Sequence, residues 1–308
     1  MKHRKSAGHL AALFTILIWG TTFISTKVLL TDFRPVELLF FRFVMGFAAL
    51  LLACPHRMKG VERRQEMTFV LAGLCGICLY YLLENIALTY TLASNVGVIL
   101  SVAPFFTAIL SRLFLKSEGK LRVNFYIGFV VAMAGVVQIS LNGFKMQLNP
   151  AGDLLAVLAA FVWACYSILT RKISGFGYPV ILTTRRTFFY GILFMVPACV
   201  VFDFELRLER FADITYLLNL LYLGLGASAL CFITWNLAVK MLGAVKTSVY
   251  IYIVPVITVA ASVFVLQEPV TGSSAMGMVL AVLGLFLSEY NGKRTVRPEK
   301  QTIGNSRS

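Results

Sequence analysis

Glu84 is the one acid that lies well inside a long apolar stretch of this 308-residue chain. A carboxylate in so apolar a setting is costly unless it is paired or hydrated, which makes it a candidate for binding a cation or exchanging a proton. Glu37, in contrast, lies near the end of its stretch, where we expect water to solvate it. The competing interpretation of Glu84 is an inert acid bonded to a neighbouring helix.

Aromatic and polar side chains occur at several points of the same apolar stretches. Any one of these aromatics is ordinarily a packing residue, but together with a few polar groups they indicate an apolar pocket for a small molecule. The candidate substrate-binding residues are Trp19, Thr22, Tyr81, Glu84, Asn85, Ser101, Trp163, Tyr166, Trp235, Asn236, Tyr250 and Tyr252.

Metal, cofactor and enzymatic chemistry have little support in the residue types present. The three histidines, at positions 3, 9 and 56, precede or follow the apolar stretches. Cys75 and Cys78 form a C-x-x-C inside such a stretch, without the soluble context of a redox motif. No phosphate-binding G-x-x-x-x-G-K-[ST] loop occurs. We therefore expect no metal, no cofactor and no enzyme.

The composition shows which elements must position these side chains. Hydrophobic residues make up 58% of the chain and charged residues 14%, and the mean hydropathy is +0.81, well outside the range of soluble proteins. About 20 apolar residues suffice for a helix to cross a bilayer. Such stretches cover residues 10–30, 35–53, 67–88, 95–115, 123–141, 152–170, 179–201, 214–235, 246–266 and 274–290. They predict an all-α membrane protein with ten transmembrane helices.

Basic residues divide unequally between the two sides of this predicted bundle. With a cytoplasmic N-terminus, nineteen Lys and Arg fall in inside segments, and only Arg34, Lys145, Arg207 and Arg210 fall outside. The positive-inside rule then places both termini in the cytoplasm of a multi-pass protein of the cell (inner) membrane. The net charge of +14 is thus a topology signal with the lipid bilayer as partner, and it does not indicate nucleic-acid binding.

The chain contains one unit twice. With an offset of 144, Trp19 aligns with Trp163 and Arg42 with Arg186; with an offset of 151, Asn85 aligns with Asn236 and Pro104 with Pro255. The predicted units cover residues 1–148 and 149–308, the second ending in a basic cytoplasmic tail. Because each holds five spans, the second must enter the membrane from the opposite side. Inverted repeats of this kind are typical of secondary transporters.

Several strings carry a family resemblance. WGTTFISTK followed by RPVELLFFRF, the string ENIALTYTLASNVGVILSVAPFFTAILSRLFL, and their second-half counterparts resemble the EamA-like branch of the drug/metabolite transporter superfamily. The resemblance implies a carrier of ten helices in two inverted five-helix repeats that moves small metabolites, often outward, with helices 3, 4, 8 and 9 among those lining the cavity. We expect an exporter of small amphiphilic metabolites such as amino acids, with protons as a candidate coupling ion. The alternatives are a cationic drug or multidrug efflux carrier and an uncoupled facilitator or channel.

Two prolines are candidate hinges. Pro104 and Pro255 occupy the interiors of the fourth and ninth predicted spans, at equivalent positions of the two repeats. Each removes a backbone donor and obstructs the preceding turn, so we expect a kink. A static bend adapted to packing is the alternative to a hinge.

Three basic residues are assigned structural roles. Lys27 ends the first span, where its long stem can reach the headgroups. Arg42 and Arg186 lie about two turns inside their spans and must find carbonyls, water or a carboxylate, which favours a structural latch in each repeat. Contact with the substrate is the alternative.

Small residues recur in the fifth and tenth spans. Gly128 and Gly135, like Gly277 and Gly284, are spaced by seven residues along one helix face. Small residues allow helices to approach closely in lipid. They predict a packing seam within the chain, with a dimer interface as the alternative, so the protein is either a monomer or a homodimer.

Overall fold

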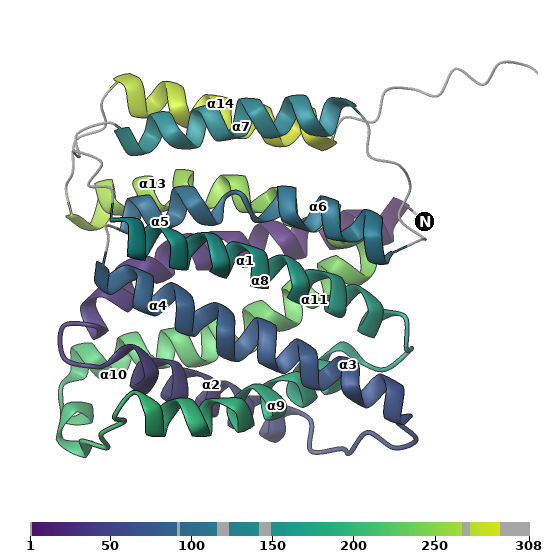
Figure 1. Cartoon of the computed structure of the whole chain (residues 1–308), viewed down its shortest axis with the longest axis vertical. Helices are drawn as coiled ribbons and strands as arrows, with labels where there is room; N and C mark the ends of the chain where they lie inside the picture. Colours follow the sequence, from purple (N-terminus) through teal and green to yellow (C-terminus); the bar gives the residue numbers. More distant parts are fainter. Residues whose placement is uncertain (1, 91–92, 116–122, 142–148, 267–271, 290–308) are drawn as a thin grey trace, which may run out of the picture.

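The computed structural model describes residues 2–90, 93–115, 123–141, 149–266 and 272–289. These residues form helices that run side by side between two ends of the molecule, and none of them forms a strand (Figure 1). The basic tail predicted after residue 289 lies outside the described residues.

The helices of the first half run from residue 2 to residue 141. They are α1 (Lys2–Leu29), α2 (Pro35–Ala53), α3 (Arg63–Gly73), η1 (Leu74–Leu79), α4 (Tyr80–Tyr90), α5 (Ala93–Leu100), α6 (Ala103–Phe114) and α7 (Val123–Leu141).

The helices of the second half run from residue 150 to residue 289. They are α8 (Pro150–Ser174), α9 (Val180–Val201), η2 (Leu208–Ala212), α10 (Ile214–Leu221), η3 (Tyr222–Leu230), α11 (Cys231–Leu242), α12 (Ala244–Ser248), η4 (Val249–Ile253), α13 (Val254–Leu266) and α14 (Gly272–Glu289).

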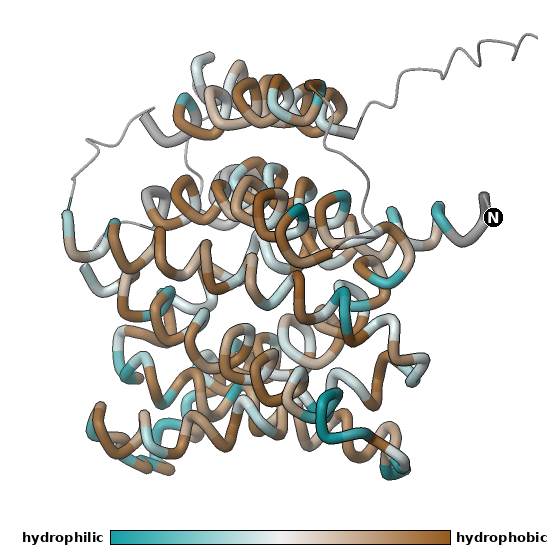
Figure 2. The backbone as a smooth tube through the Cα atoms, turned by 45° about the vertical axis from the view of Figure 1, so that its right-hand side comes forward, coloured by the Kyte–Doolittle hydropathy of each residue, from teal (hydrophilic) through white to brown (hydrophobic). Residues whose placement is uncertain are grey.

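The all-α membrane fold predicted from composition is confirmed. Seven helical runs of the described residues are long and apolar enough to cross a membrane, and three shorter apolar helices cover Val123–Gln138, Ala244–Thr258 and Ala275–Ser288. Figure 2 shows apolar residues along the middle of the bundle and hydrophilic ones gathered toward its ends. Apolar side chains on the outer surface, such as Leu52 and Val200, are 83% and 78% exposed, as expected of residues that face lipid.

Two of the predicted spans are interrupted by π-helical segments at matching places. In the first half η1 separates α3 from α4, and in the second half η3 separates α10 from α11. A π-helical turn holds an extra residue in the hydrogen-bond ladder, and such turns are frequent at functional sites. The segment on one side of the turn is therefore rotated relative to the other, which changes the side chains presented to the core.

The two prolines lie at helix starts and do not kink a continuous helix. Ser101 and Val102 form a turn between α5 and α6, and Pro104 lies in the first turn of α6. Pro255 likewise lies in the first turn of α13, directly after the 3₁₀ segment η4. Proline suits a first helical turn, where its missing N–H has no partner in any case. The α-helix of the fourth span is thus interrupted in each repeat, by a turn at Ser101 and Val102 in the first half and by the 3₁₀ segment η4 in the second.

The glycine seam joins α7 to α14 within the chain, at one edge of the bundle (Figure 1). A Cβ atom on Gly135 would lie 2.5 Å from the carbonyl oxygen of Gly277, and one on Gly128 would lie 2.6 Å from that of Gly284. No side chain fits at such distances. The last helices of the two halves thus touch backbone to backbone.

Candidate functional site

A cavity of about 60 Å³ lies between the two halves of the chain. Helices α1, α4, α5 and α6 of the first half and α8, η4 and α13 of the second contribute to its wall. The lining residues are Trp19, Thr22, Phe23, Tyr80, Tyr81, Glu84, Gly97, Leu100, Ala103, Trp163, Ile251 and Val254. The wall is therefore mainly apolar and aromatic, with a single acid.

Aromatic rings form the part of the wall around the centre of the molecule. The rings of Trp19 and Trp163, which are repeat equivalents, meet edge to face at 5.3 Å between centroids. Tyr80 contacts both Trp163 and Tyr81, each at 4.7 Å. Faces of aromatic rings attract cations, most strongly where water is excluded.

Glu84 is the acidic residue of this wall, and its side chain is only 8% exposed. It lies one helical turn from Tyr80 in the same wall and interacts through charge with Arg42. Arg42 is itself 2% exposed, lies over the ring of Tyr81 at 4.5 Å and donates from Nε to Ser228 at 3.0 Å. A buried acid and an aromatic wall together form the kind of site that can hold an ammonium group or a proton, whereas the charge of Arg42 opposes both.

Five of the twelve residues predicted to bind substrate line the cavity: Trp19, Thr22, Tyr81, Glu84 and Trp163. Tyr80 was missed, although it lies four residues before Glu84 and so on the same helix face. This four-residue spacing was the sequence signal that could have identified Tyr80 as a wall residue. Gly97, Leu100, Ile251 and Val254 carried no chemical signal, because they contribute only apolar wall.

The predicted asparagines hold helices together. Asn85 donates to the carbonyl of Pro35 at the start of α2, at 3.2 Å. Its repeat equivalent Asn236 donates to Thr184 at 2.9 Å and accepts from the hydroxyl of Tyr166 at 2.9 Å. Each asparagine thus ties the third span of its half to the second.

The other predicted site residues lie away from the cavity lining. Ser101 is fully buried and donates to the carbonyl of Gly97. Tyr250 pairs with His9 at 2.6 Å, and Tyr252 is buried in a cluster with residues of α7 and α14. Trp235 is fully buried against Trp19, with ring centroids 5.1 Å apart.

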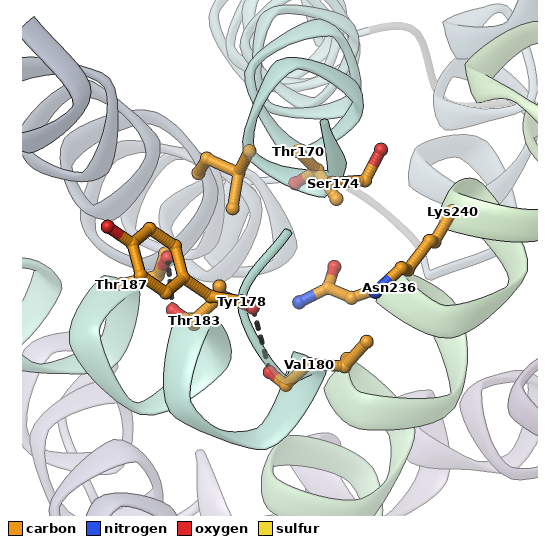
Figure 3. Close-up of a pocket in the computed structure, with 9 residues that line it drawn as sticks. Thr170, Ser174, Tyr178, Val180, Thr183, Thr187, Asn236 and Lys240 are labelled. Atoms are coloured by element: carbon orange, nitrogen blue, oxygen red, sulfur yellow. Dashed lines mark hydrogen bonds between the residues drawn. The ribbon is translucent and has the colours of Figure 1, made fainter. Parts of the chain in front are cut away.

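A second, smaller pocket opens between α8, α9 and α11 (Figure 3). Its volume of about 10 Å³ holds at most about one water molecule. The hydroxyls of Thr183 and Thr187 on its wall donate to backbone carbonyls, and the amide of Asn236 is paired at both ends. At that volume the pocket is too small for a substrate, and the central cavity is the better candidate.

Residues 202–213 of the second half fold over the N-terminal end of α2, where the carboxylate of Glu37 binds them. Glu37 is fully buried, and its carboxylate accepts from Arg210 at 2.6 Å and from the backbone N–H of Glu205 at 3.0 Å. Arg210 is 7% exposed and also lies 3.5 Å from Asp32. The expectation that water solvates Glu37 was therefore wrong, because a segment from the other half covers it.

Charged residues at the rim of this contact reinforce it. Arg34 pairs with Glu205 at 2.9 Å, and Arg207 pairs with the same carboxylate at 2.5 Å. The hydrogen bond from Arg207, with the charges of Arg207 and Arg34, lowers the pKa of Glu205 below its ordinary value. We call the contact of Asp32, Arg34 and Glu37 with Glu205 and Arg210 the charged clasp.

At the opposite end of the bundle the roles of the halves are reversed. Arg185 of α9 donates to the carbonyls of Cys54 and His56, and Tyr178 donates to that of Gly60 at 3.1 Å. In each half, therefore, the segment between the second and the third span is held by residues of the other half.

The remaining basic residues that were predicted to have structural roles are Arg186 and Lys27. Arg186 forms an ion pair with Glu66 of α3, and its Nε donates to that carboxylate at 2.9 Å. Lys27 is exposed in the last turn of α1.

Comparison with known proteins gives a consistent picture. The sequence pattern described as the EamA-like transporter family matches residues 6–141 and again residues 150–290. A protein of Archaeoglobus fulgidus named an uncharacterized transporter is 27% identical, over 92% of this chain and 97% of the relative. A probable amino-acid metabolite efflux pump of Escherichia coli K12 is 26% identical, over 91% of this chain and 93% of the relative. A crystal structure with 21% identity, covering 92% of this chain and 96% of the other, superimposes with a TM-score of 0.75 and shares the fold.

Proposed function

Because the chain belongs to the EamA-like transporter family, we propose that it is a secondary transporter that exports small amphiphilic metabolites, amino acids foremost, by alternating access. The observation that carries the proposal is the position of Glu84 in an aromatic cavity lined by both halves. Sites between the repeats near the middle of the bilayer are where inverted-repeat carriers bind their substrates.

The size of the cavity supports a mechanism with moving helices. Small-molecule sites generally occupy about 300 to 1,000 Å³. At about 60 Å³ the cavity is too small for a metabolite, so the proposed transport requires a second conformation with a larger cavity. Substrate is admitted when the helices around the breaks at Ser101 and η4 move apart.

The choice of amino acids rests on the site and on one relative. An ammonium group suits Glu84 and the aromatic wall, and the Escherichia coli relative is named a probable amino-acid metabolite efflux pump. A carrier of cationic drugs would use the same acid and rings. In an uncoupled facilitator or channel, Glu84 would not exchange a proton during transport.

We further propose that the protein lies in the cell (inner) membrane as a monomer or homodimer, with both termini in the cytoplasm. In that orientation the charged clasp closes the outer end, and the contacts of Arg185 and Tyr178 close the inner end. The repeats correspond to residues 1–148 and 149–308.

Counterflow in proteoliposomes tests the carrier proposal. Vesicles that hold the full chain and are preloaded with an unlabelled amino acid should accumulate the labelled one transiently above its equilibrium level. A carrier gives this overshoot because each turnover exchanges one substrate for another. Entry of every small solute without an overshoot, at a rate that does not saturate, would make the protein a channel.

We expect the two prolines to affect rate more than stability. Pro104→Ala and Pro255→Ala restore a backbone donor at a first helical turn and allow the α-helix to extend across the break. We predict that both variants fold and bind substrate but transport it several-fold more slowly than the parent. Initial rates in vesicles, normalised to the amount of protein, measure this. Parental rates in both variants would show that the breaks serve packing alone.

A further inference from the structure

The two halves of the chain differ in one hydrogen bond at the central cavity. Trp19 donates from Nε1 to the carbonyl of Ala227, in the π-helical segment η3, at 3.0 Å. Its repeat equivalent Trp163 has no hydrogen-bond partner for Nε1, although the side chain is only 3% exposed. A buried donor without an acceptor is costly, so it calls for an explanation; the indole N–H of Trp235, which does not line the cavity, is unpartnered as well.

The repeat explains why Trp163 does not make the bond of its equivalent. The counterpart of Ala227 is Gly76, in the π-helical segment η1. Tyr166 packs directly on Gly76, where a Cβ atom would lie 2.6 Å from Cε2 of the ring. The counterpart of Tyr166 in the first half is Thr22, which leaves more room beside the helix. The ring of Tyr166 thus takes the place beside η1 that is open beside η3.

A second difference between the halves lies at the same cavity. Glu84 corresponds to Trp235, so the first half supplies an acid where the second supplies a buried indole. Tyr80 lies one helical turn from Glu84 in α4, and its ring lies 4.7 Å from that of Trp163. The cavity wall therefore includes the acid Glu84 and, in Trp163, an indole whose N–H has no hydrogen-bond partner.

From this arrangement we infer that the indole N–H of Trp163 determines specificity by donating to the carboxylate of the substrate, while Glu84 and the aromatic wall hold its ammonium group. The inference rests on the proposed function and narrows its substrate class to molecules that carry both charges. A cationic drug has no carboxylate to accept this hydrogen bond. Its binding would leave the indole N–H unpaired, so the site discriminates against plain amines.

Matched pairs of ligands test the inference. L-Phenylalanine and phenethylamine differ in the carboxylate, as do L-leucine and 3-methylbutylamine. The concentration of each that gives half-maximal thermal stabilisation of the purified full chain is measured for the parent and for Trp163→Phe, which keeps an aromatic ring and loses the N–H. We expect the variant to bind the amino acids about tenfold or more weakly and the amines unchanged, because a hydrogen bond to a charged group is lost.

Two further variants serve as controls. Trp19→Phe removes an indole N–H that already has a partner, so it should leave the ratio between amino acid and amine unchanged. Glu84→Gln should weaken both members of each pair, because both carry the ammonium group. The melting temperature without ligand reports whether each variant is folded.

Three results would overturn the inference. In the first, Trp163→Phe weakens amino acid and amine equally, which makes the ring a packing residue. In the second, the parent binds the amines at least as well as the amino acids, which keeps a carrier but makes its substrate a cation. In the third, none of the four ligands stabilises the parent, which removes the proposal of amino-acid export and the inference with it.

Discussion

Replacing Glu84 with Gln is expected to lower the rate of substrate transport by about 10- to 100-fold, because a hydrogen-bonded charge is worth about 1.5 to 3 kcal/mol. The substitution keeps the size of the side chain and its capacity for hydrogen bonding. It removes only the negative charge that faces the aromatic cavity. Initial rates in proteoliposomes, normalised to protein, measure the change.

The same variant separates coupling from simple binding. In the parent, acidifying the side that presents substrate neutralises Glu84 and should weaken binding of an ammonium group, so transport falls as pH falls. Glu84→Gln should show no such dependence. Glu209→Gln removes an exposed acid and is the matched control, with parental behaviour expected. If Glu84→Gln keeps the parental rate and pH profile, the acid is structural and the protein transports without proton exchange.

The largest effect on stability is expected from Glu37→Gln. Breaking a buried ion pair by removing one partner costs about 3 to 5 kcal/mol, because the other charge remains buried. Here Arg210, with a side chain that is 6% exposed, would keep its charge and lose its closest described partner. We expect a clear fall in the melting temperature of the purified protein and faster tryptic cleavage at Arg207 and Arg210.

Asp32→Asn is the matched control for this prediction. Asp32 contacts the same guanidinium at 3.5 Å, but its side chain is 41% exposed, so its removal should cost only about 0 to 1 kcal/mol. The double variant Glu37→Gln/Arg210→Gln removes both charges and should recover part of the lost stability. Equal melting temperatures for Glu37→Gln and Asp32→Asn would mean that the charged clasp does not stabilise the fold.

The helical membrane fold follows from sequence because hydropathy reports directly on burial in lipid. Internal similarity placed Trp19 and Trp163 at equivalent positions, and the structure brings their rings together at the cavity. Glu84 stood out because an acid in an apolar stretch is rare for energetic reasons that need no tertiary information.

Other features depend on contacts that no local pattern encodes. Glu37 looked solvated because it lies near a span end, and only the return of residues 202–213 over α2 buries it. The two prolines predicted a disturbance of the fourth and ninth spans, but a proline can either kink a helix or begin a new one. The π-helical turns have no residue signature of their own, so the positions of η1 and η3 could not be foreseen.

The seam between α7 and α14 has a consequence for how the protein is made. A chain is synthesised from its N-terminus, and domains ordinarily fold as they emerge. Here α7 closes the first half, but the only helix that its glycines fit among those described is α14, which follows residues 142–271. The first half must therefore wait in the bilayer with this face uncovered until the final helix has been inserted.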